Sequence, residues 1–181
     1  TSGTLFSSHD VLRAIWVGLY VLVAAAIIWS RVGLPLLRSW RHELRIDRVV
    51  RESGDLVSVY VRGRNLAQLG AQGGQFFSWR FLTRHWWWQA HPYSLSAGAN
   101  GSWLRITVKD LGDQSGALTQ LCPGTRVIAE GPYGVFTANA RRTPRIVAFA
   151  AGVGITPIRA LLDDVPPSVA VTLVYRIATT D

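Results

Sequence analysis

Residues 145–175 read RIVAFAAGVGITPIRALLDDVPPSVAVTLVY, and this stretch decides the class of the fold. After Arg145 the chain is apolar through Ala151, as in a strand that is buried on both faces. A glycine turn and a helical pattern to about Asp163 follow, and a second apolar run spans residues 169–175. Strand, turn, helix and strand in this order predict the opening of a parallel α/β sheet, which we place at residues 143–181.

The preceding residues, 41–142, follow a different period. Apolar and polar side chains alternate at residues 44–47, 57–62 and 104–109, which is typical of half-buried antiparallel strands. Breaks rich in glycine and polar residues separate these segments. Several short strands of this kind predict an antiparallel β-barrel.

Residues 1–40 contain a long apolar segment, AIWVGLYVLVAAAIIWS at 14–30, which carries no charge. Its length is near the lower limit for a helix that crosses ~30 Å of hydrocarbon, and leucines continue to Leu37. We therefore predict an N-terminal transmembrane α-helix. A buried helix of a soluble protein and a cleaved signal peptide are the alternatives. Arginines concentrate after the segment, which places the later residues on the cytoplasmic side.

The composition limits the classes of function. The net charge of +8 comes almost entirely from arginine, and it suits phosphate groups or anionic lipid. The sequence shows no recognition helix for nucleic acid and no Cys/His spacing of a metal site. The single cysteine, Cys122, excludes an intrachain disulfide. Because the chain starts at Thr1 and has no methionine, we expect a piece of a longer protein.

The glycine turn, Gly152-Val153-Gly154, is a candidate phosphate site. Glycines at this position let the backbone approach a pyrophosphate, and the following helix N-terminus offers free N–H groups. Pro157 suits a first helical turn, although it stands where a GxGxxG motif has its third glycine. An ordinary tight turn is the alternative.

The segment His91-Pro92-Tyr93-Ser94 suits a flavin. A flavin ring needs an aromatic face to pack against and a hydroxyl near the nitrogen that takes up hydride, and Tyr93 and Ser94 supply these groups. His91 is placed to reach a phosphate or a ribose. An edge strand interrupted by proline is the alternative.

Two further segments lie before and after the flavin segment. Ser115 and Gly116, followed by Thr119, are typical of a phosphate cradle, and equally of a helix N-cap. Trp86-Trp87-Trp88 directly precedes the flavin segment, where these rings either shield a flavin, lie at a membrane surface or pack in the barrel.

The order of these motifs resembles the ferredoxin–NADP⁺ reductase superfamily. His-Pro-Tyr-Ser comes first, then Gly-x-x-Thr, Gly-Pro-Tyr-Gly at residues 131–134 and Gly-x-Gly-x-Thr-Pro at residues 152–157. With a preceding apolar helix and an arginine-rich junction, the chain is similar to the ferric reductase and NADPH oxidase branch. The resemblance implies a last membrane helix, then an FAD-binding barrel, then a truncated Rossmann-like NAD(P)-binding domain.

The resemblance also implies roles for particular residues. Tyr93 packs on the flavin and Ser94 bonds near its reactive nitrogen, so these two are the candidate catalytic residues. The remaining candidates bind cofactor: His91 and Pro92 beside them, Val108 and Lys109 along the FAD phosphates and adenosine, Ser115, Gly116 and Thr119 at its pyrophosphate, and Gly152, Gly154, Thr156 and Pro157 at the pyrophosphate of NAD(P)H.

The implied activity is electron transfer from NAD(P)H through FAD to haem in upstream membrane helices, and on to an acceptor such as ferric iron or oxygen. The implied place is the cell membrane, with the lipid bilayer as a partner and the barrel in the cytoplasm. The segments that position nicotinamide in this family lie beyond Asp181, so the chain is expected to be incomplete for catalysis. Two alternatives stay open: a reductase that serves a separate ferredoxin or oxygenase, and a membrane-anchored barrel that binds a partner without cofactor.

Overall fold

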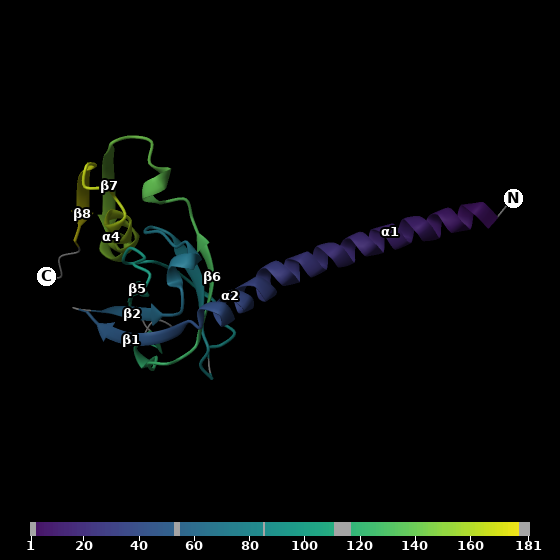
Figure 1. The fold of residues 1–181 in the computed structure, drawn as a ribbon, viewed down its shortest axis with the longest axis horizontal. Helices are drawn as coiled ribbons and strands as arrows, with labels where there is room; N and C mark the ends of the chain where they lie inside the picture. The colour runs from purple at the N-terminus through teal and green to yellow at the C-terminus, as the bar shows by residue number, and fades with distance from the viewer. Residues whose placement is uncertain (1–2, 53–54, 85, 111–116, 178–181) are drawn as a thin grey trace. The chain divides into compact units, whose positions relative to one another are not determined.

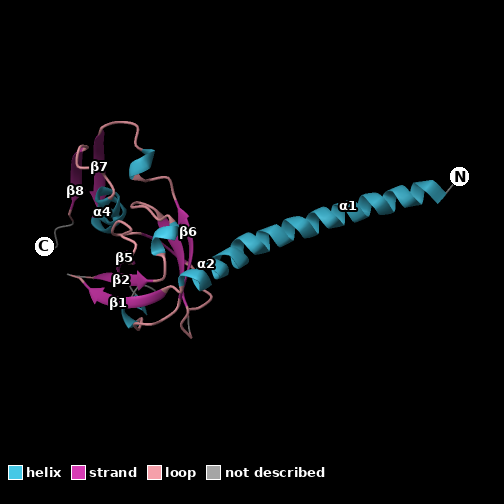
Figure 2. Cartoon of the chain, viewed as in Figure 1, coloured by secondary structure: helices cyan, strands magenta, loops and turns pink. Residues whose placement is uncertain are grey.

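A computed structural model describes residues 3–52, 55–84, 86–110 and 117–177. The chain divides into two units, Thr1–Arg38 and Ser39–Asp181. Figure 1 traces the helix of the first unit and the sheets of the second, and Figure 2 marks their secondary structure.

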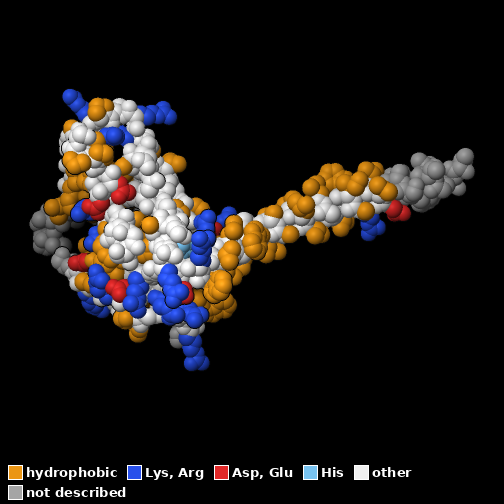
Figure 3. All heavy atoms as spheres, in the orientation of Figure 1, with side chains coloured by type: hydrophobic (Ala, Val, Ile, Leu, Met, Phe, Trp, Pro, Cys, Tyr) orange, Lys and Arg blue, Asp and Glu red, His pale blue; other side chains and the backbone are white. Residues whose placement is uncertain are grey.

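The first unit is helical. Helix α1 (Gly3–Ile28) is followed by a π-helical turn, η1 (Trp29–Gly33), and by α2 (Leu34–His42), which runs into the second unit. The π-helical turn ends two residues before Pro35, whose ring and missing N–H disturb an α-helical ladder. Within the described residues, Asp10–His42 is one helix long and apolar enough to cross a membrane. Figure 3 shows hydrophobic side chains along the described part of α1.

The helix is therefore longer than the predicted span of Ala14 to about Leu37. Residues 3–13 and 38–42 contain no proline, so nothing in the sequence stops the backbone ladder at the edges of the apolar run. Hydropathy identifies the part of the helix that suits the hydrocarbon of a membrane, whereas the backbone hydrogen bonds of the helix continue into the polar residues on either side.

The second unit begins with a barrel of two three-stranded antiparallel sheets. One sheet has the order β1 (Arg45–Arg51), β2 (Leu56–Arg62), β5 (Trp103–Lys109), and the other has the order β4 (His91–Ser94), β3 (Phe76–Phe81), β6 (Val127–Tyr133). The bridges Arg45↔Arg126 and Leu95↔Ile106 join the two sheets. Short 3-10 helices lie between strands: η2 (Leu66–Leu69), η3 (Ala117–Gln120) and η4 (Ala138–Ala140).

The predicted alternation is confirmed by the core of the barrel. Val57, Val59 and Val61 on β2 are buried, and they pair with Val108, Ile106 and Leu104 on β5. The largest fully buried side chains, Trp79, Phe77 and Phe81, all come from β3. The core is therefore closed from both sheets, as a barrel requires.

The final segment has the predicted parallel arrangement. Strand β7 (Arg145–Ala151) pairs in parallel with β8 (Ala170–Arg176), and the connection contains η5 (Gly152–Gly154) and α4 (Ile155–Asp163). The expectation that the first strand is buried on both faces is wrong for this chain. Val147 is 62% exposed and Phe149 is 73% exposed, because in the described residues one helix and one neighbouring strand cover β7.

Candidate functional site

The predicted flavin segment forms the edge strand β4. Its register against β3 pairs Trp79 with His91, Phe77 with Tyr93 and Phe76 with Ser94. The indole Nε1 of Trp79, which is fully buried, donates to the carbonyl oxygen of Tyr93 at 3.1 Å. The core therefore fixes the backbone of β4, which is an edge strand of its sheet and contacts β5 near the Leu95↔Ile106 bridge.

His91 and Tyr93 form an aromatic pair on one face of this strand. Their rings are nearly parallel, 5° apart with centroids at 5.9 Å, and Trp86 lies 5.7 Å from His91 on the other side. Burial lowers the pKa of His91 below its ordinary value and raises the pKa of the Tyr93 phenol. Within the described residues, the buried Nε2 of His91 has no hydrogen-bond partner. An unpartnered imidazole nitrogen suits a ligand that donates or accepts a hydrogen bond there.

Ser94 lies on the opposite face of β4 from Tyr93, because consecutive side chains of a strand alternate. A flat ligand across the strand edge can therefore meet the Tyr93 ring on its face and the Ser94 hydroxyl at its rim. Pro92, exposed between His91 and Tyr93, leaves no N–H to pair along this edge.

Sequence reasoning missed a polar network that joins β4 to β5. The Oγ of buried Ser96 accepts hydrogen bonds from Arg105 Nε at 3.0 Å and from Thr107 Oγ1 at 2.8 Å, and Arg105 Nη2 donates to the Ser96 carbonyl at 2.7 Å. Ser58 continues the network to β2 at 2.8 Å from Thr107. The polar positions Arg105 and Thr107 of the alternating strand 104–109 were visible in the sequence. Their partners, Ser96 and Ser58, lie in other segments and could not be identified from it.

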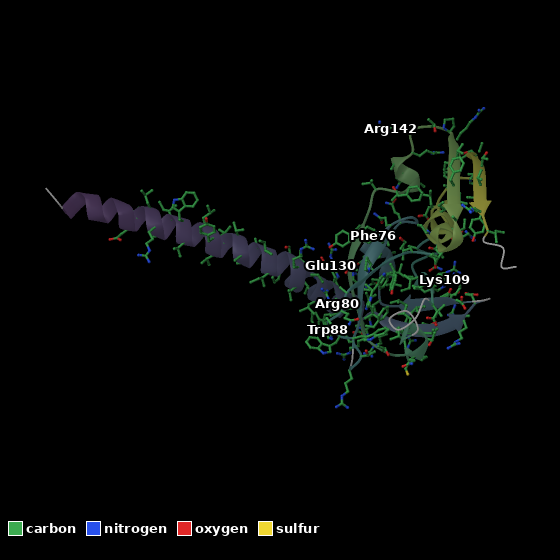
Figure 4. The ribbon with its side chains drawn as sticks, turned by 180° about the vertical axis from the view of Figure 1, so that it is seen from behind. Phe76, Arg80, Trp88, Lys109, Glu130 and Arg142 are labelled. Carbon is green, nitrogen blue, oxygen red and sulfur yellow. The ribbon has the colours of Figure 1, made fainter. Side chains whose placement is uncertain are left out.

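Two of the other predicted FAD-binding residues lie on the neighbouring sheet. Val108 and Lys109 close strand β5, opposite Val57 and Leu56, and Lys109 is exposed. Figure 4 shows Lys109 away from Trp88, on a different side of the barrel. Thr119 follows fully buried Leu118 in η3, which contacts β1 and β2. Ser115 and Gly116 lie outside the described residues.

The glycine turn is open above its backbone. A Cβ atom added at Gly152 or Gly154 would meet nothing within 4 Å, and Gly152 has φ of +51°, which favours glycine. Thr156 Oγ1 donates to the Val153 carbonyl at 2.9 Å, so this hydroxyl closes the turn itself. Pro157, in the first turn of α4, is partly buried. The open backbone leaves room for a phosphate at the start of the helix.

Strand β5 brings these segments together. It contacts β4 through the bridge Leu95↔Ile106, and it also contacts η5. The flavin segment and the glycine turn thus contact the same strand. Tyr93 and Leu118 further belong to one cluster, because Tyr93 packs against the core that contains Leu118.

Helix α4 is fixed to the barrel through its C-terminal end. Asp164 Oδ2 accepts a hydrogen bond from the Gly73 N–H at 2.5 Å, and Asp163 Oδ2 accepts one from the Gly98 N–H at 3.0 Å. Two carboxylates at a helix C-terminus interact unfavourably with the helix dipole, and these hydrogen bonds offset that cost. Ala160 of the same helix is fully buried against the core. The contact sets the position of the glycine turn relative to the barrel.

The ionisation of Asp163 strengthens this contact. Burial raises the pKa of Asp163, but the Gly98 hydrogen bond and the charges of Arg159 and Arg105 outweigh burial and lower the pKa below its ordinary value. A carboxylate with a depressed pKa stabilises the fold above its unfolded pKa. The contribution of Asp163 is therefore lost as the pH falls through its folded pKa.

Replacing Asp164 by alanine is expected to lower the free energy of unfolding by about 1–3 kcal/mol, because buried Gly73 loses the acceptor of its N–H. Denaturant unfolding of the full-length protein measures this loss. Asp47→Ala is the matched control, since Asp47 forms surface ion pairs with Arg48 and Arg62, which contribute less than ~1 kcal/mol. Equal stability of the two variants would contradict the docking role of Asp164.

Known proteins are similar to this chain in sequence and in fold. No family model matches the chain. NADPH oxidase 3 of Rattus norvegicus is 28% identical over 143 residues, covering 72% of this chain and 24% of the relative. The flavohemoprotein of Chromobacterium violaceum is 31% identical over 175 residues, covering 86% of this chain and 43% of the relative. The chain thus spans about a quarter of the first relative and less than half of the second.

The crystal structure of the flavohem-like FAD/NAD binding domain of nitric oxide dioxygenase from Vibrio cholerae O1 biovar El Tor superposes with a TM-score of 0.57 at 22% identity. The superposition covers 75% of this chain and 62% of that domain.

The fold first defines a class of protein: an antiparallel barrel with β4 at a sheet edge, followed by the opening of a parallel α/β domain. The particular family follows from the sequence matches and the shared fold. The chain belongs to the ferredoxin–NADP⁺ reductase superfamily and is related to its NADPH oxidase-like branch.

Proposed function

We propose that this chain is part of a membrane-associated flavoprotein oxidoreductase. Electrons pass from NAD(P)H through FAD to haem in a ferric-reductase-like membrane domain, and on to an acceptor such as ferric iron or oxygen. One observation carries the proposal: the edge strand β4, whose His91 has an imidazole nitrogen without a partner among the described residues, and the open glycine turn both contact β5.

The described residues fit an FAD molecule. The unpartnered Nε2 of His91 suits a polar atom of the cofactor, and Tyr93 offers a ring face. Lys109 adds an exposed positive charge at the end of β5, where the phosphates would run. Pro92, Val108, Ser115, Gly116 and Thr119 complete the proposed FAD site.

FAD supplies the conversion of a two-electron donor into one-electron steps, which haem requires. The chain itself binds and orients. Tyr93 excludes water from one ring face, and Ser94 donates a hydrogen bond at the ring edge, so these two are the proposed catalytic residues. Gly152, Gly154, Thr156 and Pro157 form the proposed site for the pyrophosphate of NAD(P)H.

The names of the relatives support these cofactors. One relative is an NADPH oxidase, another is a flavohemoprotein, and the structural neighbour is an FAD/NAD binding domain. The haem partner rests on this relationship and on the apolar helix that precedes the barrel.

We propose that the chain divides into three segments with different roles. Residues 1–40 hold the last membrane helix and its flank, residues 41–142 the FAD-binding barrel, and residues 143–181 the start of the NAD(P)-binding domain. Arginines after the apolar run favour the cell membrane with the barrel on the cytoplasmic side.

Mixing the full-length protein anaerobically with NADH or NADPH tests the proposal. The flavin absorption band should bleach first, and the haem bands should shift afterwards. A protein that purifies without flavin and does not take it up would refute the proposal and favour a barrel that binds a partner without cofactor. Flavin reduction with no haem in the protein would instead identify a reductase for a separate ferredoxin or oxygenase.

A further inference from the structure

The loop between β3 and β4 exposes two large rings. Trp87 is 61% exposed and Trp88 is 63% exposed, and Leu82 at the start of the loop is 39% exposed. Exposed apolar side chains that lie together mark an interaction surface more often than isolated ones do. Figure 4 shows Trp88 at the periphery of the barrel.

These two rings have no part in the barrel core. Their neighbour Trp86 packs against the core and lies 5.7 Å from the His91 ring, and the Gln89 N–H closes a turn on the Trp86 carbonyl at 3.0 Å. The turn thus directs one tryptophan inward and leaves the next two outward. Barrel packing explains Trp86, and it does not explain Trp87 or Trp88.

A third exposed tryptophan lies at the same end of the sheet. Ser39 Oγ donates to the Val127 carbonyl at 3.3 Å, and the Leu82 N–H donates to the Arg126 carbonyl at 2.9 Å. Trp40, which follows Ser39, is 79% exposed. The start of the second unit and the β3–β4 loop therefore bond to consecutive residues, Val127 at the start of β6 and Arg126 just before it.

The charges around these rings are basic. Arg41, Arg84 and Arg126 are exposed, and residues 82–89 contain no acidic side chain. Tryptophan prefers the headgroup layer of a bilayer, where its ring is partly apolar and its N–H is hydrated. Arginine adds attraction to the anionic lipids of the cytoplasmic leaflet. Exposed tryptophans together with arginines favour an anionic membrane surface. An acidic groove on a partner protein would explain the arginines but not the exposed rings.

We propose that this tryptophan surface, made of Trp40, Leu82, Arg84, Trp87 and Trp88, docks into the headgroup layer of an anionic bilayer. The inference rests on the proposed membrane anchoring of the chain. Trp40 follows Leu37, the last leucine of the apolar run, by three residues, which span at most about 11 Å. The surface is thus tethered close to the bilayer, and docking holds the barrel against the membrane.

Photo-crosslinking in lipid nanodiscs tests the docking. In the full-length protein, Trp88 is replaced by the photoreactive residue p-benzoylphenylalanine, and mass spectrometry identifies the adducts. The expected adduct is to lipid, in nanodiscs that contain phosphatidylglycerol. The same replacement at Val135, which is 86% exposed, is the matched control and should give no lipid adduct.

Charge dependence gives a second measurement. Adding Arg84→Gln to the Trp88 variant should lower the yield of lipid adduct about fivefold, because one basic residue near an anionic surface is lost. Nanodiscs of phosphatidylcholine alone should lower it further. Adducts to protein segments, or a lipid yield equal to that at Val135, would overturn the proposal.

Two independent readouts separate this inference from the proposed function. Flotation with liposomes reports the membrane anchor, and the flavin absorption band of the same sample reports the cofactor site. A protein that floats and binds flavin but forms no lipid adduct at position 88 refutes the docking surface alone. A protein without flavin that still forms the adduct refutes the oxidoreductase and leaves the docking surface intact.

Discussion

Replacing Ser94 by alanine is expected to slow the reduction of bound FAD by NAD(P)H by roughly a hundredfold. Ser94 ends the edge strand β4, on the opposite face from the Tyr93 ring, where we propose that its hydroxyl bonds to the rim of the flavin. Removing one preorganised donor that acts on developing charge costs on the order of 10²–10³ in rate. Stopped-flow absorbance of the full-length protein under anaerobic conditions measures the effect.

Two variants make the Ser94 result specific. Ser94→Thr keeps the hydroxyl and should retain most of the rate. Ser78→Ala makes the same change on β3, at a residue that pairs with Pro92 and lies on the same face as Ser94. Its rate should equal that of the unaltered protein. If Ser94→Ala reduces its flavin as fast as Ser78→Ala does, Ser94 has no catalytic part.

Replacing Tyr93 by alanine is expected to weaken FAD binding by about tenfold to a hundredfold. The Tyr93 ring is half-buried and lies parallel to the His91 ring, and we propose that a flavin ring packs on it. Losing an aromatic contact of this size removes roughly 1.5–3 kcal/mol of apolar burial. Titration of the flavin-free protein with FAD, followed by fluorescence, gives the dissociation constant.

Tyr93 also packs against the barrel core, so the variants need a check of folding. Tyr93→Phe keeps the ring and should bind FAD within about threefold of the unaltered protein, since the hydroxyl is the only group lost. Thermal unfolding of each flavin-free variant separates lost packing from lost ligand contact. An alanine variant that is folded and binds FAD normally would show that the flavin does not lie on Tyr93.

Local patterns were sufficient for much of the fold. The strands of residues 57–62 and 104–109 alternate strictly, and the helix to Asp163 is flanked by a glycine turn and by Pro166-Pro167, so period and breakers located these elements. The parallel pairing of β7 with β8 followed from their order along the chain.

The long-range contacts were not accessible in the same way. Asp163 and Asp164 look like solvated residues at a helix end, and only the fold brings the Gly73 and Gly98 N–H groups to them. The exposure of Phe149 was missed for a related reason, because burial of a strand depends on elements that its own sequence does not describe.

Short motifs were sufficient to predict a flavin segment at residues 91–94, although its chemistry stays a prediction. His91, Tyr93 and Ser94 lie within four residues of one another, so a single strand contains all three. In the structure this strand is at the edge of a sheet. The unpartnered Nε2 of His91 could not be foreseen, since it depends on which residues surround the ring. The roles of all these residues remain predictions for the experiments above.

Hydrogen exchange of the full-length protein, measured with and without FAD, tests the central claim most directly. FAD held at the edge of β4 should slow exchange in peptides covering residues 90–97 and 105–109, and NAD(P)H should then slow exchange around residues 152–157. Protection by FAD that falls elsewhere, with these peptides unchanged, would contradict a flavin site at β4.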